Sequence, residues 1–125
     1  DGKTVRWVGE LNQSEVIKLY QGALVFLFPP LWSEPFGLVA IEALSCGTPV
    51  IAYPNGGLTE IVKDGENGYL VKNTREMAAK ISNINKIDRK NCRLSVEKNF
   101  SIEKMVSDYE KVLLRAVWKV THKSF

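Results

Sequence analysis

The fold of this chain is decided by one stretch, Ser33-Glu34-Pro35-Phe36-Gly37-Leu38-Val39-Ala40-Ile41-Glu42-Ala43-Leu44. It predicts a helix whose first turn holds Pro35, because the missing N–H of proline costs nothing there. The free N–H groups at such a helix start, together with the helix dipole, form an anion site. Apolar residues surround Glu42, so we expect the helix to be buried and this carboxylate to be paired. An anion site followed two turns later by a diol-binding acid favours a nucleotide that carries a sugar.

Short apolar runs alternate with helical patterns along the rest of the 125 residues. Continuous apolar runs ended by proline or glycine are typical of buried parallel strands, and we expect strands at residues 5–8, 24–28, 50–53 and 69–71. Amphipathic spacing predicts helices between and after these strands, with starts near residues 12, 58, 88 and 101 and a further helix marked by the stripe Met77, Ile81 and Ile84. The alternation predicts a single α/β domain over residues 1–125, with a Rossmann-like parallel sheet and right-handed crossovers.

The last predicted helix carries apolar residues on more than one side. Ser101 is placed to cap it, and Met105 and Tyr109 belong to a face that we expect to pack inward. Leu114 and Trp118 lie off that face, among basic residues. Three interpretations remain open for this second surface: a contact with another domain, a basic amphipathic surface for a membrane that holds a lipid acceptor, or a solvated face.

Composition describes an ordinary globular protein, with 45% hydrophobic and 25% charged residues and a net charge of +3. That charge suits an anionic ligand but is too small to indicate nucleic acid as a partner. No apolar run approaches the ~20 residues of a transmembrane helix, and the N-terminus does not resemble a signal peptide. Because the chain opens with Asp1, we expect it to be part of something larger.

The cysteine and histidine residues favour neither a disulfide nor a metal site. Cys46 and Cys92 are the only cysteines, and they lack the spacing of a metal cluster. We expect two reduced, inert thiols in a cytoplasmic protein, with peripheral attachment to the inner face of the membrane as an alternative. His122 is the only histidine, which argues against a histidine-based catalytic site and against zinc.

Several motifs occur in an order that resembles a known family. The chain is similar to the donor-binding, C-terminal half of a GT-B glycosyltransferase, within the retaining family 4 enzymes (glycosyl transferase group 1). The resemblance runs from about Val5 to the C-terminus. It rests on these motifs: Val5-Arg6-Trp7-Val8-Gly9, Phe28-Pro29, Glu34 and Glu42, Gly47-Thr48-Pro49-Val50-Ile51-Ala52, Gly56-Gly57, and Asp64-Gly65 with Gly68-Tyr69-Leu70-Val71.

The resemblance gives the two acids separate roles. It assigns Glu42 to the two ribose hydroxyls of the donor, which suits an ionised carboxylate as a double acceptor. It places Glu34 beside the transferring sugar, near the charge that develops at the anomeric carbon, and so makes it the catalytic residue. The alternatives are a structural acid satisfied by neighbouring N–H groups for Glu42, and a helix-start acid favoured by the dipole for Glu34.

The same resemblance implies main-chain contacts around these acids. The N–H groups of Phe36 and Gly37 would face the sugar hydroxyls, and those of Leu38 and Val39 the β-phosphate. Leu11 matches a position where the family touches the base with its main chain. The structural alternatives are a core aromatic for Phe36, a turn for Gly37 and a plain core residue for Leu11.

The resemblance also implies what the chain lacks. Related donor domains begin with two further strands, which lie between the predicted strands 5–8 and 24–28 and bring cationic contacts to the diphosphate. We therefore expect a partial domain that transfers no sugar alone and self-associates through its unpaired strand.

The expected reaction follows from the same family. It is transfer with retention from a UDP- or GDP-sugar, without a metal or other cofactor, to an acceptor carbohydrate or lipid-linked sugar on an absent N-terminal domain. The alternatives are a non-catalytic nucleotide-sugar-binding module, a subunit of a two-chain transferase, and an α/β domain that only echoes the pattern.

Overall fold

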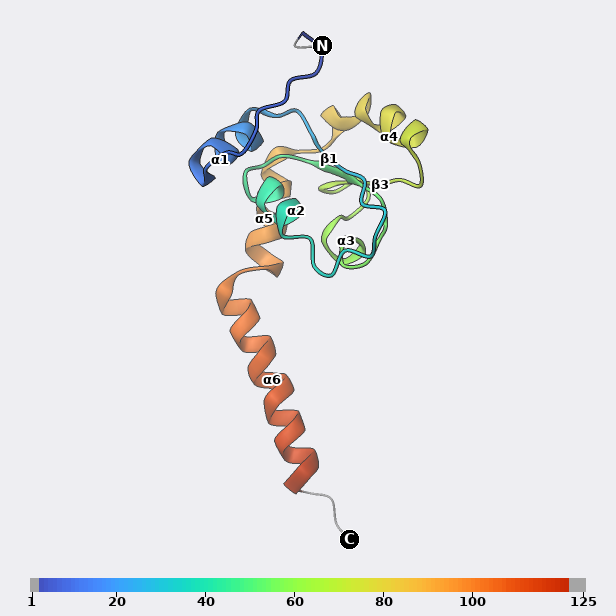
Figure 1. Cartoon of the computed structure of the whole chain (residues 1–125). Helices are drawn as coiled ribbons and strands as arrows, with labels where there is room; N and C mark the ends of the chain where they lie inside the picture. The colour runs from blue at the N-terminus through green and yellow to red at the C-terminus, as the bar shows by residue number, and fades with distance from the viewer. Residues whose placement is uncertain (1–2, 122–125) are drawn as a thin grey trace.

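The protein is a small α/β domain followed by one long helix (Figure 1). The computed structural model describes residues 3–121. Three short strands lie in the order β1-β2-β3, and all pairs are parallel, which confirms the predicted parallel α/β sheet. The elements are α1 (Gln13–Gly22), β1 (Phe26–Phe28), α2 (Leu38–Ser45), β2 (Val50–Ala52), α3 (Leu58–Ile61), β3 (Gly68–Leu70), α4 (Thr74–Ile81), the 3-10 helix η1 (Ile84–Lys86), α5 (Arg89–Asn99) and α6 (Ile102–Thr121).

The sheet is built around β2, which is buried along its whole length. Phe26 of β1 pairs with Val50 of β2, and Val50 pairs in turn with Gly68 of β3. A Cβ on Gly68 would collide with the carbonyl oxygen of Val50, so only glycine fits this register. β1 has a neighbour on one side only, and Leu27 at its centre is exposed.

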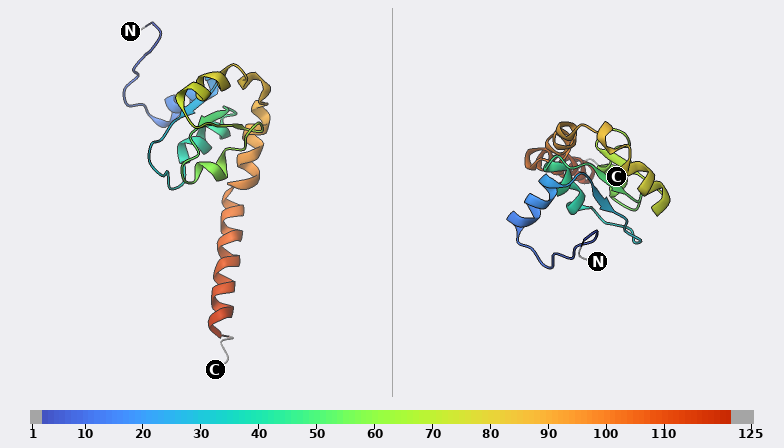
Figure 2. Two further views of the ribbon diagram at one scale, coloured as in Figure 1. Left: turned by 90° about the vertical axis from the view of Figure 1, so that its right-hand side faces the viewer. Right: turned by 90° about the horizontal axis from the view of Figure 1, so that it is seen from above.

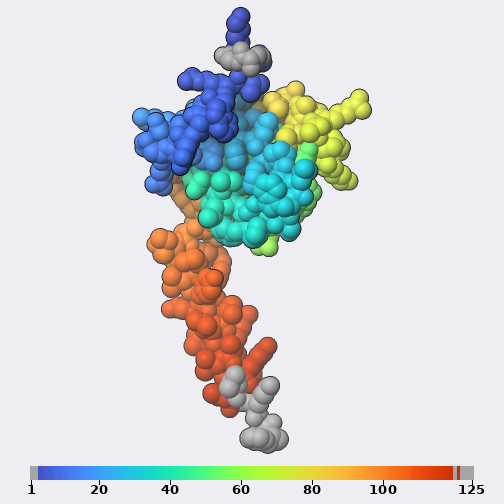
Figure 3. All heavy atoms as spheres, in the orientation of Figure 1, coloured from blue at the N-terminus to red at the C-terminus, as the bar shows by residue number. Residues whose placement is uncertain are grey.

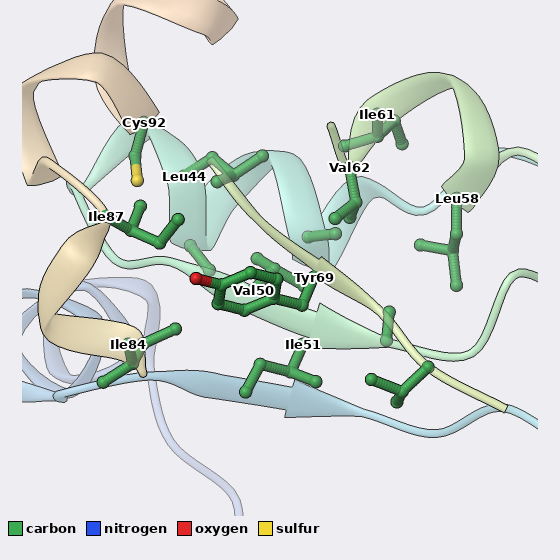
Figure 4. Close-up of a cluster of buried hydrophobic side chains, with 14 of the residues drawn as sticks. Leu44, Val50, Ile51, Leu58, Ile61, Val62, Tyr69, Ile84, Ile87 and Cys92 are labelled. Carbon is green, nitrogen blue, oxygen red and sulfur yellow. The ribbon is translucent and has the colours of Figure 1, made fainter. Parts of the chain in front are cut away.

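The hydrophobic core lies between the sheet and the helices that pack on it (Figure 4). α2 contacts β1, β2, α3 and α5, while α4 covers β2. Burying one large aliphatic side chain contributes roughly 1.5–3 kcal/mol, so these contacts dominate the stability of the domain. The largest fully buried side chains of this core include Leu44, Ile51, Leu58, Ile84 and Cys92.

Local capping explains where the helices begin. Asn12 caps α1 in a complete capping box, in which its side chain accepts from the Glu15 amide and the Glu15 carboxylate accepts from the Asn12 amide. Asp88 caps α5 through a single bond, in which its side chain accepts from the Lys90 amide. The hydroxyl of Ser101 accepts from the Lys104 amide, as predicted for the start of the last helix.

The guanidinium of Arg89 ties α5 to the end of α1. It donates to the carbonyl oxygens of Ala23 at 2.7 Å and Gln21 at 3.0 Å, and to the hydroxyl of Thr48 at 3.1 Å. The carbonyls at a helix end have no partner within the helix and attract cations. One side chain therefore joins the first helix to the C-terminal half of the domain.

The expected strand at residues 5–8 is wrong. The structure has no strand there, and Val5, Trp7 and Val8 are exposed. A strand needs a neighbour for its backbone N–H and C=O groups. No strand of the described part of the chain lies beside this segment, so the segment stays extended over the surface.

The expected inward packing of the last helix is also wrong. α6 projects away from the domain as a separate rod, which all three whole-molecule views show (Figures 1, 2 and 3). Met105 and Tyr109 of the predicted inward face are 53% and 65% exposed, and Leu114 and Trp118 of the second surface are also exposed. Ion pairs of Lys104 and Lys111 with Asp108 lie along its first half.

Two further points concern membrane-spanning helices and the single histidine. Among the described residues, no helix has both the length and the apolarity that crossing a bilayer requires. His122, the single histidine, lies outside the described residues.

Candidate functional site

The loop between β1 and α2 carries the first acid of the predicted pair. α2 begins at Leu38, three residues later than the expected start at Pro35. The reason is Gly37, which adopts the left-handed conformation with φ of 97° and breaks the helical path just before Leu38. The Glu34 carboxylate accepts from the Gly37 amide at 3.1 Å. Glu34 therefore lies outside the helix and satisfies a donor at its start.

A second contact holds the same carboxylate. The indole Nε1 of Trp32 donates to Glu34 Oε2 at 3.1 Å, while Gly37 donates to Oε1. The sequence reasoning missed Trp32. Its position two residues before the acid was the available signal, because a tryptophan N–H is a donor without acceptor capacity.

The loop after β2 packs against the loop that carries Glu34. The Gly57 amide donates to the carbonyl oxygen of Glu34 at 2.8 Å, and the Asn55 side chain donates to the carbonyl oxygen of Pro30 at 2.6 Å. A Cβ at Gly56 would collide with the backbone of Glu34, and one at Gly57 would lie 2.7 Å from the carbonyl oxygen of Phe36. The Gly-Gly motif thus lets two loops pack backbone against backbone.

The start of α2 is open to solvent. Leu38 is 63% exposed and Val39 is 38% exposed, and their N–H groups belong to the first helical turn, where no carbonyl within the helix is available. Phe36 packs edge-on against Phe100 at the end of α5, with ring centroids 6.2 Å apart. Leu38 and Val39 are thus exposed residues of the first helical turn, while the amide of Gly37 is engaged by Glu34.

Glu42 does not have the buried surroundings that we expected. It is exposed, because the face of α2 that packs inward carries Ala40, Ala43 and Leu44. The small, apolar helix has one solvent-facing side, and the carboxylate lies on it. The expectation of a buried, paired carboxylate at Glu42 is wrong, and the side chain is free to meet a ligand.

A cavity of about 720 Å³ lies beside α2, and Glu42 lines it. Leu11, the predicted base contact, lines the same cavity, together with Tyr20 of α1 and Cys46. The structure thus brings Leu11 and Glu42 together. The other predicted residues, from Glu34 to Val39, lie outside this lining, around the start of the same helix.

Cationic side chains line the cavity on its α5 side. They are Arg89, Lys90 and Arg93, the last paired with Glu97 at 2.7 Å. Burial raises the pKa of Tyr20 on the opposite wall above its usual value, with the charges of Glu42 and Cys46 acting in the same direction. The sequence reasoning placed no cation here, because nothing in the order of residues joins α5 to α2 before the fold is known.

The chain is thus an α/β domain with a three-stranded parallel sheet, an exposed helix start after the first strand and, on the same helix, an acid that faces a cavity. The family described as "Glycosyl transferases group 1" matches residues 2–99. The chain belongs to this family. The match ends just before α6.

Individual relatives agree with the family assignment. The chain is 48% identical over 67 residues to D-inositol 3-phosphate glycosyltransferase 2 of Catenulispora acidiphila. The aligned region covers 54% of this chain and 16% of that protein. It is 29% identical over 120 residues to spore coat protein SA of Bacillus subtilis, covering 86% of this chain and 32% of that protein. The chain therefore matches less than a third of the length of each relative.

Solved structures agree on the fold. A sucrose-phosphate synthase of Thermosynechococcus elongatus matches with a TM-score of 0.75 and 33% identity, over 95% of this chain and 31% of that one. The Anabaena protein HepE, solved in complex with UDP-glucose, matches with a TM-score of 0.69 and 25% identity, over 81% of this chain and 30% of that one. The fold of this chain is that of GT-B glycosyltransferases.

Proposed function

We propose that residues 1–125 are the donor-binding part of a retaining glycosyltransferase that uses a nucleoside-diphosphate sugar. The observation that carries the proposal is the arrangement of α2. Its open N-terminal turn suits a diphosphate, and Glu42 faces a cavity on its flank. The solved relative with bound UDP-glucose supports a nucleotide sugar as the ligand.

The nucleoside half of the donor occupies the cavity in this proposal. Glu42 accepts hydrogen bonds from the two ribose hydroxyls, and the main chain at Leu11 meets the base, uracil or guanine. Both residues line the one cavity. A charge-assisted bond of this kind contributes about 1.5–3 kcal/mol.

The sugar diphosphate half lies across the start of α2. The N–H groups of Leu38 and Val39 bind the β-phosphate, those of Phe36 and Gly37 face the sugar hydroxyls, and Glu34 lies beside the anomeric carbon. In the structure the Gly37 amide donates to the Glu34 carboxylate. A bound sugar hydroxyl therefore shares this donor with the carboxylate. The two loops that hold Glu34 keep it rigid, which favours interactions that strengthen in the transition state.

The reaction is a transfer on one face of the sugar. The bond between the anomeric carbon and the β-phosphate oxygen breaks, and a bond from the acceptor oxygen forms on the same face. The acceptor proton passes to the leaving diphosphate oxygen. Charge on the diphosphate is stabilised by the helix start and by cationic side chains, without a metal or other cofactor in this proposal.

The acceptor and the setting belong to the longer protein. A carbohydrate or lipid-linked sugar acceptor on an N-terminal domain follows from the family, and the short match to each relative leaves room for such a domain. Two free thiols support a cytoplasmic location. The exposed surface of α6 suits a domain contact, with attachment at a membrane surface as the alternative.

Nucleotide binding tests the proposal in the full-length protein that carries this chain. Glu42→Gln removes the charge-assisted bond to the ribose, so the Kd for UDP or GDP measured by calorimetry should rise ~10- to 150-fold. Glu66→Gln, at an exposed turn outside the cavity lining, is the matched control and should bind normally. Equal affinity of the folded Glu42→Gln variant and the control removes Glu42 from the site. Tight binding without transfer to any acceptor identifies a non-catalytic module.

A further inference from the structure

The carboxylate of Glu34 is held at both oxygens. Oε1 accepts from the Gly37 amide and Oε2 from the Trp32 indole, each at 3.1 Å. A glutamate side chain has three rotatable bonds and loses up to ~2 kcal/mol of rotamer freedom when it is fixed. Two donors on different sides of the carboxylate determine its plane as well as its position.

The indole of Trp32 makes its hydrogen bond from an exposed position. Trp32 is 60% exposed and is absent from the hydrophobic core, so burial does not explain its position. Its Nε1 can only donate, and the acceptor it meets is the proposed catalytic carboxylate. The hydrogen bond between Trp32 and Glu34 is itself exposed.

The two donors to Glu34 are not equivalent once a sugar binds. The Gly37 amide is among the main-chain donors that face the sugar hydroxyls in the proposed function, so a bound sugar competes for it. The Trp32 indole is a side-chain donor that the sugar need not displace. It keeps Oε2 in place while Oε1 exchanges its partner.

We propose that Trp32 is a positioning residue that holds the Glu34 carboxylate in the orientation that transfer requires. The inference rests on the proposed role of Glu34. It adds a residue that neither the sequence motifs nor the comparisons single out. Displacing a reacting group by about 1 Å costs up to ~100-fold in rate, so losing this hydrogen bond should slow transfer without weakening donor binding.

The experiment replaces the indole by a ring without a donor in the full-length protein. Trp32→Phe should lower kcat by roughly 10-fold and leave the KM for the donor within about twofold. Trp7→Phe makes the same change at a tryptophan that is 90% exposed and should leave both constants unchanged. Equal melting temperatures of the two variants exclude a folding effect.

A double mutant separates positioning from any other role. In a Glu34→Ala background, Trp32→Phe should cause no further loss of kcat, because the acceptor is already gone. An equal loss in both backgrounds, or none in the presence of Glu34, overturns the inference. If Glu34→Ala alone leaves kcat unchanged, the proposed function of Glu34 falls first, and the two failures are told apart.

A spectroscopic measurement needs no activity. The indole N–H resonance of Trp32 should move in Glu34→Ala, because it loses its acceptor, while that of Trp7 should not. An unmoved Trp32 resonance means that the hydrogen bond does not form in solution, and the inference is then wrong.

Discussion

Glu34 and Glu42 flank the same short helix and meet different surroundings. Glu34 is fixed by donors at both oxygens and by a backbone bond from Gly57. Glu42 is exposed on the side of a cavity. A fixed group suits a role in the reacting geometry, and an open one suits ligand binding. Substitutions at the two acids should therefore affect different kinetic constants.

The two cysteines should differ sharply in reactivity. Burial raises the pKa of the Cys92 thiol to about 11, and its side chain is fully buried, while Cys46 is partly exposed at the cavity. Because the thiolate is the reactive form, iodoacetamide at pH 8 should label Cys46 in the folded protein and leave Cys92 intact. Peptide mass mapping measures both, with unfolded protein as the control in which both react.

The same pKa sets a dependence of stability on pH. Unfolded Cys92 loses its proton near 9.0 and folded Cys92 near 11. Between these values the folded state binds more protons, so the free energy of unfolding contributed by Cys92 falls as the pH rises through this window. Early labelling of Cys92 at pH 8 would contradict both statements.

The sequence identified the acids of the candidate site better than it predicted their burial and their contacts. The motif identified both acids, and Cys92 is buried as an inert thiol should be. The burial of Glu42 was wrong because α2 is short and packs with one small-residue face. The contact of Trp32 with Glu34 depends on the loop conformation that Gly37 sets, which residue spacing alone does not encode.

Among the elements, α6 has the least support from the rest of the chain. It is a single helix of 20 residues with most of its apolar side chains exposed. Most of the stability of a helix in a protein comes from the packing of its apolar face, which α6 lacks within the described residues. In contrast, α5 packs on α2 and is tied to α1 through Arg89.

Limited proteolysis of the 125-residue chain should follow this difference. Trypsin should cut first at the basic residues of α6, because cleavage needs local unfolding and α6 unfolds at the lowest cost. Time-resolved mass spectrometry should show a resistant fragment that retains α5. Lys63 and Lys86, exposed residues of the domain itself, are the internal control, and earlier cleavage there would refute the ranking of stability. In the full-length protein, a domain that covers α6 should slow the cuts in this helix.

Element prediction succeeded where the signal was local. The capping residues Asn12 and Ser101, amphipathic spacing and continuous apolar runs located most helices and three strands. It failed for residues 5–8 and for the packing of α6, because both depend on partners elsewhere. A β-prone run becomes a strand only beside another strand, and an amphipathic helix packs only where a surface exists to receive it.

The whole molecule presents two surfaces that a folded domain usually covers. One is the outer edge of β1, with unpaired backbone groups and the exposed Leu27, and the other is α6. Unpaired strand edges favour pairing with another chain. The extended segment 5–8 no longer supplies a strand for this pairing, so β1 takes its place as the expected contact.

The isolated chain should therefore self-associate and transfer no sugar. Light scattering coupled to size-exclusion chromatography should give a mass above 14.1 kDa that grows with concentration. Leu27→Lys, which adds a charge at the edge strand, should shift the chain toward the monomer, and a Leu114→Lys variant tests the alternative contact through α6. A well-folded monomer at high concentration would mean that the edge of β1 is already protected, and transferase activity of this chain alone would show that nothing essential is missing.

The parallel sheet affects the order in which the parts of the chain fold. Each strand pairs with one that lies beyond an intervening helix, so no two strands can zip together from a tight turn. Capped helices form within about a microsecond, whereas strand pairing must wait for long loops to close. We therefore expect the pairing that sets Val50 against Gly68 to form late in folding.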